Sequence, residues 1–501
     1  MYTDTLTVNC MEYSSRAIQD PPQPVSRLLY EQVADRLTSI IDAGTLRPGD
    51  RVPSLRRTST AQGVSLSTSL QAYVLLESRG LIEARPQSGF YVRPSLSARL
   101  AEPPVRTCPP GPTSIDVGAL ARQVFQAATD PAIVPLGAAC PSPDVLPTKK
   151  LGRLVTAITR SAGSEINTYV FPPGRVELRR ELARRTVDWR YPLPATGVAV
   201  TCGATEALLL TLSTVAARGD MVAVESPAYF GMLLLLEHLG LRAIEIPADP
   251  ASGLRLDALA SALRRHRISA CIASPTCQNP LGATMPDDAK RELLALLSRH
   301  DTPLIEDDVY GDAFHGGERP LPVKAWDRKG VVVLCSSFSK LAAPGYRVGW
   351  VAGGRYHEAL MQRQLTTTLA LPALPQLAMA AFLRSGAYDS HTRHTRALYA
   401  RQVALAREAI ARHFPPGTRA TRPTGGLVLW VELPPSVDAL RLGDEALRAQ
   451  VSIAPGPLFS PRREYRHCIR LNCGYPWTPV IDGAYRTLGR LASEQAASKR
   501  R

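Results

Sequence analysis

The sequence lacks any hydrophobic run that could span a bilayer. The leucine cluster at 233–236 is cut short by Glu237 and His238, whereas a membrane-spanning helix needs about 20 consecutive apolar residues. Residues 1–10 have neither the basic start nor the apolar centre of a secretory signal peptide. We therefore expect neither a transmembrane segment nor a signal peptide.

Cysteine pairs are also missing. The nine cysteines are scattered, with no Cys-x-x-Cys pair and no regular spacing. They therefore predict neither a disulfide framework nor a zinc site. This pattern is typical of a reducing compartment, and we expect a cytoplasmic protein without a bound metal.

A concentrated basic segment is absent too, although the chain as a whole is basic. The 501 residues carry a net charge of +15, which attracts polyanions such as nucleic acid. Residues 25–95 hold only nine basic residues against six acidic ones, so most of the excess lies elsewhere. The length, with 45% hydrophobic and 21% charged residues, predicts a globular protein of two or more domains.

Residues 25–93 have the pattern of a small domain that follows a polar tail at 1–24, which we expect to be disordered. Apolar residues recur at helical spacing between Leu28 and Ile41. Ser54 and Ser65 can cap two further helices, at 55–62 and 66–78. Residues 81–92 predict two short strands about a turn. Three helices and a β-hairpin make a winged helix-turn-helix. The apolar positions expected to face its core are Leu29, Val33, Leu37, Ile40 and Ile41 in the first helix, and Leu70, Tyr73 or Val74, and Leu76 in the third.

Such a domain predicts DNA binding, because a short helix after a tight turn can place its first residues in the major groove. Small polar side chains there can reach base edges, and nearby arginines can bind phosphates. The alternative is a winged helix used only for protein contacts. The candidate DNA-contacting residues are Arg56, Arg57, Ser65, Ser67, Thr68, Gln71 and Arg85.

Two runs in this domain, at 47–54 (RPGDRVPS) and 72–82 (AYVLLESRGLI), resemble the DNA-binding domain of GntR-family regulators. Many family members have an arginine after the serine that opens the recognition helix. This chain has Leu66 there.

Residues 94–130 are rich in proline and predict a semi-stiff linker, with a helix between Ile115 and Ala128. From residue 131 to about 495 apolar strands alternate with helical stretches, which indicates an α/β domain with a largely parallel sheet. A smaller C-terminal subdomain is expected at about 390–490. The predicted strands of the sheet are Gly197–Thr201, Met221–Glu225, Ala243–Ile246, Ala270–Ser274, Pro303–Glu306 and Val331–Leu334.

The stretch from Ser336 to Trp350 follows the last of these strands. It contains Lys340, and an arginine, Arg347, follows a Pro-Gly turn. A lysine at the end of a buried strand can be desolvated, which lowers its pKa and frees its amine to attack a carbonyl. Hydroxyl groups and an arginine suit a phosphate. The combination suggests a lysine held as a Schiff base to pyridoxal 5'-phosphate (PLP), although a surface lysine after a strand is the plainer alternative.

Other polar groups follow earlier strands, where α/β sheets bind ligands. Gly203-Ala204-Thr205 opens a helix whose backbone N–H groups could bind a phosphate. Tyr229 could stack on a ring, Asn279 could donate to a ring hydroxyl, and Asp307 could keep a ring nitrogen protonated. Tyr310 could reach the ring oxygen. Each has an ordinary structural alternative, namely a core aromatic, a turn asparagine or a helix cap.

In this order the motifs resemble the fold-type I PLP-dependent aminotransferases over about 131–490. The resemblance implies Lys340 as the aldimine lysine, Asp307 on the pyridine nitrogen, and Asn279 and Tyr310 on the ring oxygen. It also implies Tyr229 stacked on the ring. The phosphate would be surrounded by Gly203, Ala204, Thr205, Ser337, Ser339 and Arg347. Two further matches are Tyr169, which would reach the partner subunit's phosphate, and Arg470, which would grip a substrate carboxylate.

A GntR-like domain followed by such a domain resembles the MocR/GabR family of transcriptional regulators. The resemblance implies a homodimer that binds operator DNA and uses PLP on Lys340 to sense an amino compound. Two alternatives stay open. One is an active aminotransferase that carries a DNA-binding domain, since no catalytic residue is missing. The other is a repressor whose effector is PLP itself.

Overall fold

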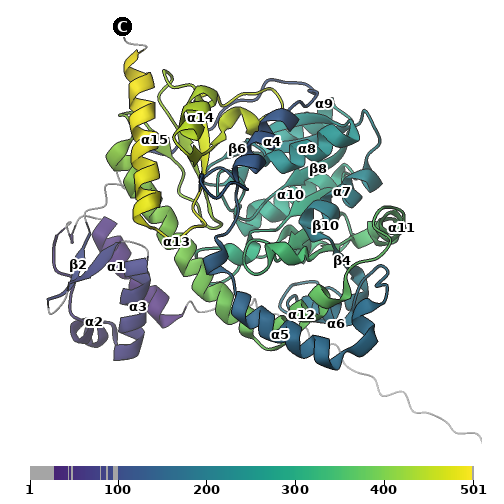
Figure 1. The fold of residues 1–501 in the computed structure, drawn as a ribbon, viewed down its shortest axis with the longest axis horizontal. Coiled ribbons are helices and arrows are strands. Elements are labelled where there is room, and N and C mark those ends of the chain that lie inside the picture. Colours follow the sequence, from purple (N-terminus) through teal and green to yellow (C-terminus); the bar gives the residue numbers. More distant parts are fainter. Residues whose placement is uncertain are drawn as a thin grey trace, which may run out of the picture.

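The computed structural model describes residues 28–42, 45–46, 49–78, 81–85, 88–93 and 100–498. The expected disordered tail at 1–24 lies outside these residues. In the described part a small N-terminal domain lies beside a much larger one (Figure 1). No helix of the described residues is both long and apolar enough to cross a membrane.

The small domain is the predicted winged helix-turn-helix. It contains α1 (Leu29–Asp42), α2 (Leu55–Gln62), α3 (Leu66–Ser78) and the antiparallel strands β1 (Ile82–Arg85) and β2 (Gly89–Val92). The Ser54 hydroxyl accepts the Arg57 N–H at the start of α2, and Ser65 accepts the Thr68 N–H (3.0 Å) at the start of α3. These caps satisfy backbone donors that a helix leaves free. Both predicted caps are therefore confirmed.

This domain has a hydrophobic core of its own, which includes Val33, Leu37, Tyr73 and Leu76. The predicted packing is wrong at three positions: Leu29 and Ile40 on α1 are 59% and 36% exposed, and Leu70 on α3 is 47% exposed. Of the two alternatives Tyr73 and Val74, Tyr73 is the buried one. The buried face of α3 carries the predicted Tyr73 and Leu76 together with Ser69 and Ala72. The small side chains of Ser69 and Ala72 let α3 approach its neighbours closely.

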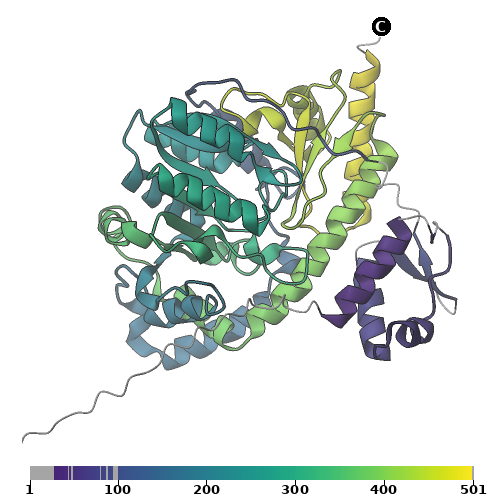
Figure 2. The same cartoon turned by 180° about the vertical axis from the view of Figure 1, so that it is seen from behind.

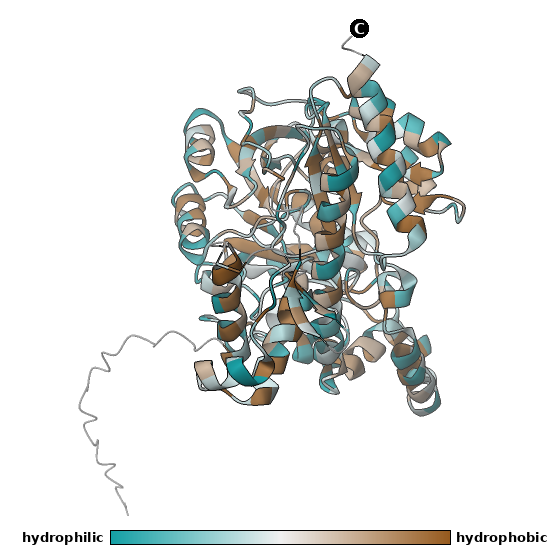
Figure 3. Ribbon diagram, turned by 90° about the vertical axis from the view of Figure 1, so that its left-hand side faces the viewer, coloured by the Kyte–Doolittle hydropathy of each residue, from teal (hydrophilic) through white to brown (hydrophobic). Residues whose placement is uncertain are grey.

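The large domain is built on a mixed, mostly parallel sheet, as predicted. Its strand order is β4-β11-β10-β9-β8-β5-β6-β7. All six predicted strands are present, and β11, which the sequence did not reveal, pairs antiparallel with both β10 and β4. Apolar residues gather in the interior around this sheet (Figure 3). The strands are β4 (Val198–Thr201), β5 (Met221–Ser226), β6 (Arg242–Asp249), β7 (Gly253–Leu254), β8 (Ile268–Ala273), β9 (Leu304–Asp307), β10 (Val332–Ser337) and β11 (Gly349–Ala352).

Helices cover both faces of this sheet, as the alternating pattern predicts. The helices of the large domain up to residue 384 are, in chain order, α4 (Gly118–Ala127), α5 (Thr148–Ser161), α6 (Val176–Arg184), α7 (Gly203–Val215), α8 (Phe230–Leu239), α9 (Leu256–Arg265), α10 (Asp287–Arg299), α11 (His357–Thr367) and α12 (Ala373–Arg384).

The C-terminal part forms a second, antiparallel sheet in the order β12-β13-β16-β15. Its strands are β12 (Arg419–Ala420), β13 (Val428–Glu432), β15 (Ala454–Pro455) and β16 (Cys468–Asn472), and its helices are α13 (Ala387–His413), α14 (Ala439–Arg448) and α15 (Pro479–Ser498). A segment from far upstream joins this part, since β3 (Val134–Pro135) pairs with β14 (Val451–Ser452) and Leu100 and Leu136 enter the same core.

The described part of the proline-rich linker is tied to the large domain. Thr113 forms a reciprocal backbone pair with Ala243 on β6, and Arg106 forms an ion pair with Glu432 (2.5 Å). The Ala101 carbonyl accepts the Ala420 N–H (3.0 Å). From residue 100 onward, therefore, this segment is part of the large domain's surface and does not act as a free spacer.

Helix α13 lies between the two domains, as the view from behind shows (Figure 2). It packs against α3 of the winged helix. Glu408 on α13 faces Arg93 at 3.8 Å, and a Cβ added at Gly317 would meet the Glu31 carboxylate of α1. The winged helix thus rests on α13 and on the loop around Gly317.

Candidate functional site

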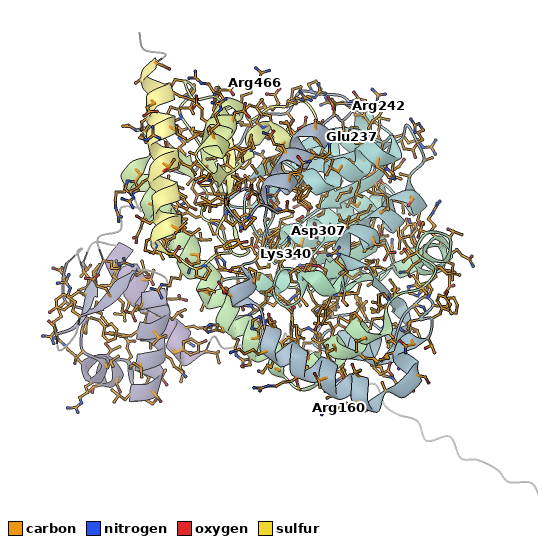
Figure 4. All side chains as sticks on the ribbon, in the orientation of Figure 1. Arg160, Glu237, Arg242, Asp307, Lys340 and Arg466 are labelled. Atoms are coloured by element: carbon orange, nitrogen blue, oxygen red, sulfur yellow. The ribbon has the colours of Figure 1, made fainter. Side chains whose placement is uncertain are left out.

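Lys340 lies directly after β10, near the middle of the large domain (Figure 4). Its Nζ donates to the Ala139 carbonyl (2.8 Å) and lies 5.8 Å from the centre of the Tyr310 ring. Burial lowers the pKa of this amine, because the charged form loses solvation. The main chain here is held by α13, where the Tyr399 hydroxyl donates to the Lys340 carbonyl (2.8 Å).

Asp307 and Tyr310 come from the end of the neighbouring strand, β9. Burial raises the pKa of the Asp307 carboxyl to about 6, although the Val309 N–H donates to it (3.2 Å). Tyr310 is 6% exposed, and its hydroxyl has no hydrogen-bond partner among the described residues. A buried phenol without a partner is unfavourable by itself, so its position beside Lys340 points to a ligand group.

Arg470, in the middle of β16, is fully buried. Its Nη1 donates to Asn279 Oδ1 (3.3 Å) and its Nη2 to the Gly137 carbonyl (2.5 Å), while its Nε has no partner among the described residues. The guanidinium carbon lies 5.4 Å and 5.1 Å from the ring centres of Phe230 and Phe459. No carboxylate balances this charge in any described ion pair, which leaves it free to bind an anion.

The residues predicted to surround a phosphate meet at the start of α7. Gly203 has φ +76°, a backbone conformation that favours glycine, and a Cβ there would also meet the Arg347 guanidinium. Arg347 donates to the Cys202 carbonyl (3.3 Å) and to Ser339 Oγ (3.5 Å), and the Ser339 N–H donates to Ser337 Oγ (3.4 Å). Ala204 is buried beside them, whereas Thr205 is exposed.

Two predicted tyrosines differ in their surroundings. Tyr229 precedes α8, and burial raises its pKa to about 12, with Arg470 acting in the opposite direction. Tyr169 is 73% exposed and stacks on Phe171 at 5.7 Å between ring centres. Tyr229 therefore belongs to the Lys340 site of its own chain, and Tyr169 points to solvent.

The candidate DNA-contacting residues lie on α2, α3 and the hairpin. Arg56, Arg57, Ser67 and Gln71 are exposed. The Ser65 hydroxyl is shared with those of Ser67 and Thr68, at 2.8 Å and 2.7 Å. Arg85 is less free than predicted, because it pairs with Glu83 (2.9 Å) and lies over the Tyr91 ring.

The segment 137–140, which forms a wall of the site beside Lys340, was not predicted from the sequence. Gly137, Ala139 and Cys140 accept hydrogen bonds through their carbonyls from Arg470, Lys340 and Asn472. The Cys140 thiol is exposed beside this site. The segment lies about 200 residues before Lys340 and has no charged side chain, so no local pattern marks it.

Comparison with known proteins agrees with both domains. Residues 141–476 match the aminotransferase class I and II family, and residues 29–92 match the bacterial regulatory proteins of the gntR family. An uncharacterized HTH-type transcriptional regulator of Escherichia coli, YdcR, is 38% identical over 93% of this chain and 99% of its own length. The aromatic-amino-acid aminotransferase 1 of Thermococcus litoralis is 28% identical over 72% of this chain and 88% of its own.

Among solved structures, the alpha-aminoadipate aminotransferase LysN of Thermus thermophilus is similar with a TM-score of 0.70 and 26% identity. The match covers 75% of this chain and 95% of that one. The large domain is thus a fold-type I aminotransferase domain joined to a GntR helix-turn-helix. The chain belongs to the MocR-type transcriptional regulators, and its cofactor is pyridoxal 5'-phosphate.

The side chains around Lys340 fit this cofactor. Lys340 offers an amine of lowered pKa and Asp307 an acid, and Tyr310 offers a buried hydroxyl without a partner in the described part of the chain. The close approach of Gly203 to Arg347 leaves backbone N–H groups and a guanidinium together, as a phosphate requires.

Proposed function

We propose that this regulator senses an amino compound at Lys340 and reports it to operator DNA through the winged helix. The observation that carries the proposal is a pair of buried atoms beside the Lys340 amine, Tyr310 Oη and Arg470 Nε, that have no hydrogen-bond partner among the described residues. An amine with a carboxylate would satisfy Arg470, and the cofactor would satisfy Tyr310.

Each residue has a specific task in this proposal. PLP supplies an aldehyde that forms reversible bonds with amines. Lys340 would attach it covalently, Asp307 would balance a protonated ring nitrogen, and Asn279 and Tyr310 would hold the ring oxygen. Tyr229 would cover the ring and exclude water. The residues that would hold the phosphate are Gly203, Ala204, Thr205, Ser337, Ser339 and Arg347.

Arg470 is the proposed reader of an effector carboxylate. A guanidinium can bind a carboxylate through two parallel hydrogen bonds. The rings of Phe230 and Phe459 on either side keep the charge out of water. An entering carboxylate would compete with Asn279 for this group, so the effector would also change the hydrogen bonding of a cofactor ligand.

Helix α13 is the proposed link to DNA binding. It donates to the Lys340 carbonyl through Tyr399 and contacts the Leu341 carbonyl through His391 Nε2 (2.7 Å). Further along, Glu408 of the same helix faces Arg93 of the winged helix. A ligand that moves the Lys340 segment can therefore bias the placement of the winged helix, which is a population shift.

We further propose a cytoplasmic homodimer. Tyr169 and Phe171 are exposed at 73% and 52% and stack on each other. Exposed neighbouring aromatics favour a protein interface. In a second copy, Tyr169 would reach the partner's phosphate. Sedimentation of the wild type and of Tyr169→Ser tests this, and a monomer in both would contradict it.

The test of sensing is a titration of purified protein with PLP and with single amino compounds while DNA binding is followed. An amino acid that changes both the absorbance of the bound cofactor and the DNA affinity supports the proposal. A response to PLP alone would identify PLP as the effector. Arg470→Ala should weaken carboxylate-bearing effectors far more than amines that lack a carboxylate, and equal losses would contradict the role of Arg470.

The second candidate function is an active aminotransferase, which the complete residue set around Lys340 favours. Steady turnover of an amino donor and a keto acid at an ordinary enzymatic rate, on the order of 1–1000 per second, without binding to any DNA would replace the regulator proposal.

A further inference from the structure

The recognition helix α3 carries an exposed apolar stripe. Leu66, Leu70 and Val74 are 50%, 47% and 55% exposed. Their spacing of four residues places them one above another on the same face of the helix. The neighbouring face, with Tyr73 and Leu76, is buried in the domain core. The stripe is therefore not part of the core, and it stays exposed although α3 also contacts α13.

The polar side chains beside the stripe are largely engaged within the helix. Ser65 accepts the Thr68 N–H, and its hydroxyl lies 2.8 Å and 2.7 Å from those of Ser67 and Thr68. Leu66 and Leu70 are thus the bulkiest free groups on the first half of α3. That half is the part of a recognition helix that meets base edges.

Charge identifies the occupant of this face as DNA. Arg56 and Arg57 on α2 are exposed and form no described ion pair, and no acidic residue lies between Leu55 and Val74. The cationic helix α2 lies beside the apolar stripe of α3. This arrangement suits the major groove, which is lined by phosphates and exposes methyl groups on the base edges. The only apolar group on the major-groove edge of any base pair is the C5 methyl of thymine.

Resting on the proposed function of DNA binding, we propose that Leu66 and Leu70 read thymine methyl groups at two fixed positions of each operator half-site. Leucine has no hydrogen-bonding group and cannot read guanine or adenine. Its burial against a methyl group removes apolar surface from water, which stabilises the complex. Gln71, exposed next to the stripe, would supply a polar contact to a neighbouring base.

The test begins with selection of bound sequences from random duplex DNA by the full-length protein. In the selected duplex each thymine is then replaced by deoxyuridine, which lacks only the methyl group. We expect about fourfold weaker binding at each contacted position and no change elsewhere. At one of these positions, the Leu66→Ala protein should bind the thymine duplex and the deoxyuridine duplex with equal affinity. The Leu70→Ala protein should do the same at the other position.

Leu29→Ala is the matched control, because Leu29 is an exposed leucine of the same domain on α1. It should keep the full preference for thymine. Selected sites without fixed thymines, or unchanged affinity after methyl removal, would overturn the inference and leave the proposed regulator intact. Failure to select any DNA would overturn the proposed function as well. Circular dichroism of each variant shows whether the domain is folded.

Discussion

The winged helix and the Lys340 site use polar groups in opposite ways. In the winged helix, the candidate functional side chains Arg56, Arg57 and Gln71 are exposed, and the core beneath them is apolar. In the large domain, Arg470 is fully buried and Tyr310 is 6% exposed, and each has a polar atom without a described partner.

The contrast shows what each region has to recognise. DNA presents a charged surface to solvent, so exposed cations and small side chains suffice. A small cofactor is enclosed, and its groups are recognised by donors and acceptors held away from water, where electrostatic interactions are stronger. In the absence of effector, we expect substitutions that leave the contacts of α13 in place to have little effect on the other region's ligand.

The largest effect is expected for Lys340→Ala. This change removes the amine that attaches the cofactor, so the visible absorbance of the protein-linked cofactor should disappear completely. The affinity for selected DNA without effector should change by less than about twofold, because the substitution keeps the main-chain carbonyl that accepts from Tyr399 on α13. Lys149→Ala, at an exposed lysine on α5, is the control that should keep the absorbance. A retained absorbance in Lys340→Ala would contradict the assignment.

Much of both regions follows from the sequence, because local rules determine it. The bounds of α2 and α3 are set by Ser54, Gly63 and Ser65, whose capping roles are legible in the sequence. The order of polar groups at strand ends marked Asn279, Asp307 and Lys340. Parallel strands bring their C-terminal ends to one edge of the sheet.

What the sequence did not reveal depends on contacts between distant segments. The antiparallel strand β11 is short, and its place between β4 and β10 is set by tertiary pairing. The wall formed by Gly137 and Ala139 acts through backbone carbonyls, which leave no trace in side-chain patterns. Leu70 was predicted to be buried because it is hydrophobic, but it is exposed. The adjacent Ser69 is the residue that packs into the core.

The double substitution Arg56→Ala with Arg57→Ala should have the opposite pattern to Lys340→Ala, with weaker DNA binding and an intact cofactor site. Loss of two phosphate contacts should lower the slope of log affinity against log salt by about two, and weaken DNA binding by about tenfold or more at 0.15 M salt. The cofactor absorbance should be unchanged. Arg264→Ala, at an exposed arginine on α9, is the control. An unchanged salt slope would mean that α2 does not face the phosphates.

The smallest expected effect is the pH dependence of cofactor affinity, which should depend on Asp307 in the buried site. The raised pKa of Asp307, about 6, means that its carboxyl is largely protonated below this pH and ionised above it. Only the ionised form can balance a protonated ring nitrogen, so cofactor affinity should rise several-fold between pH 5 and pH 7. Equilibrium dialysis of the apoprotein measures this rise, and Asp307→Asn should abolish it.

The affinity for selected DNA is the control, and it should not show this rise in the wild type or in Asp307→Asn. A rise of the same size in Asp307→Asn would assign the titration to the cofactor's own groups and not to Asp307.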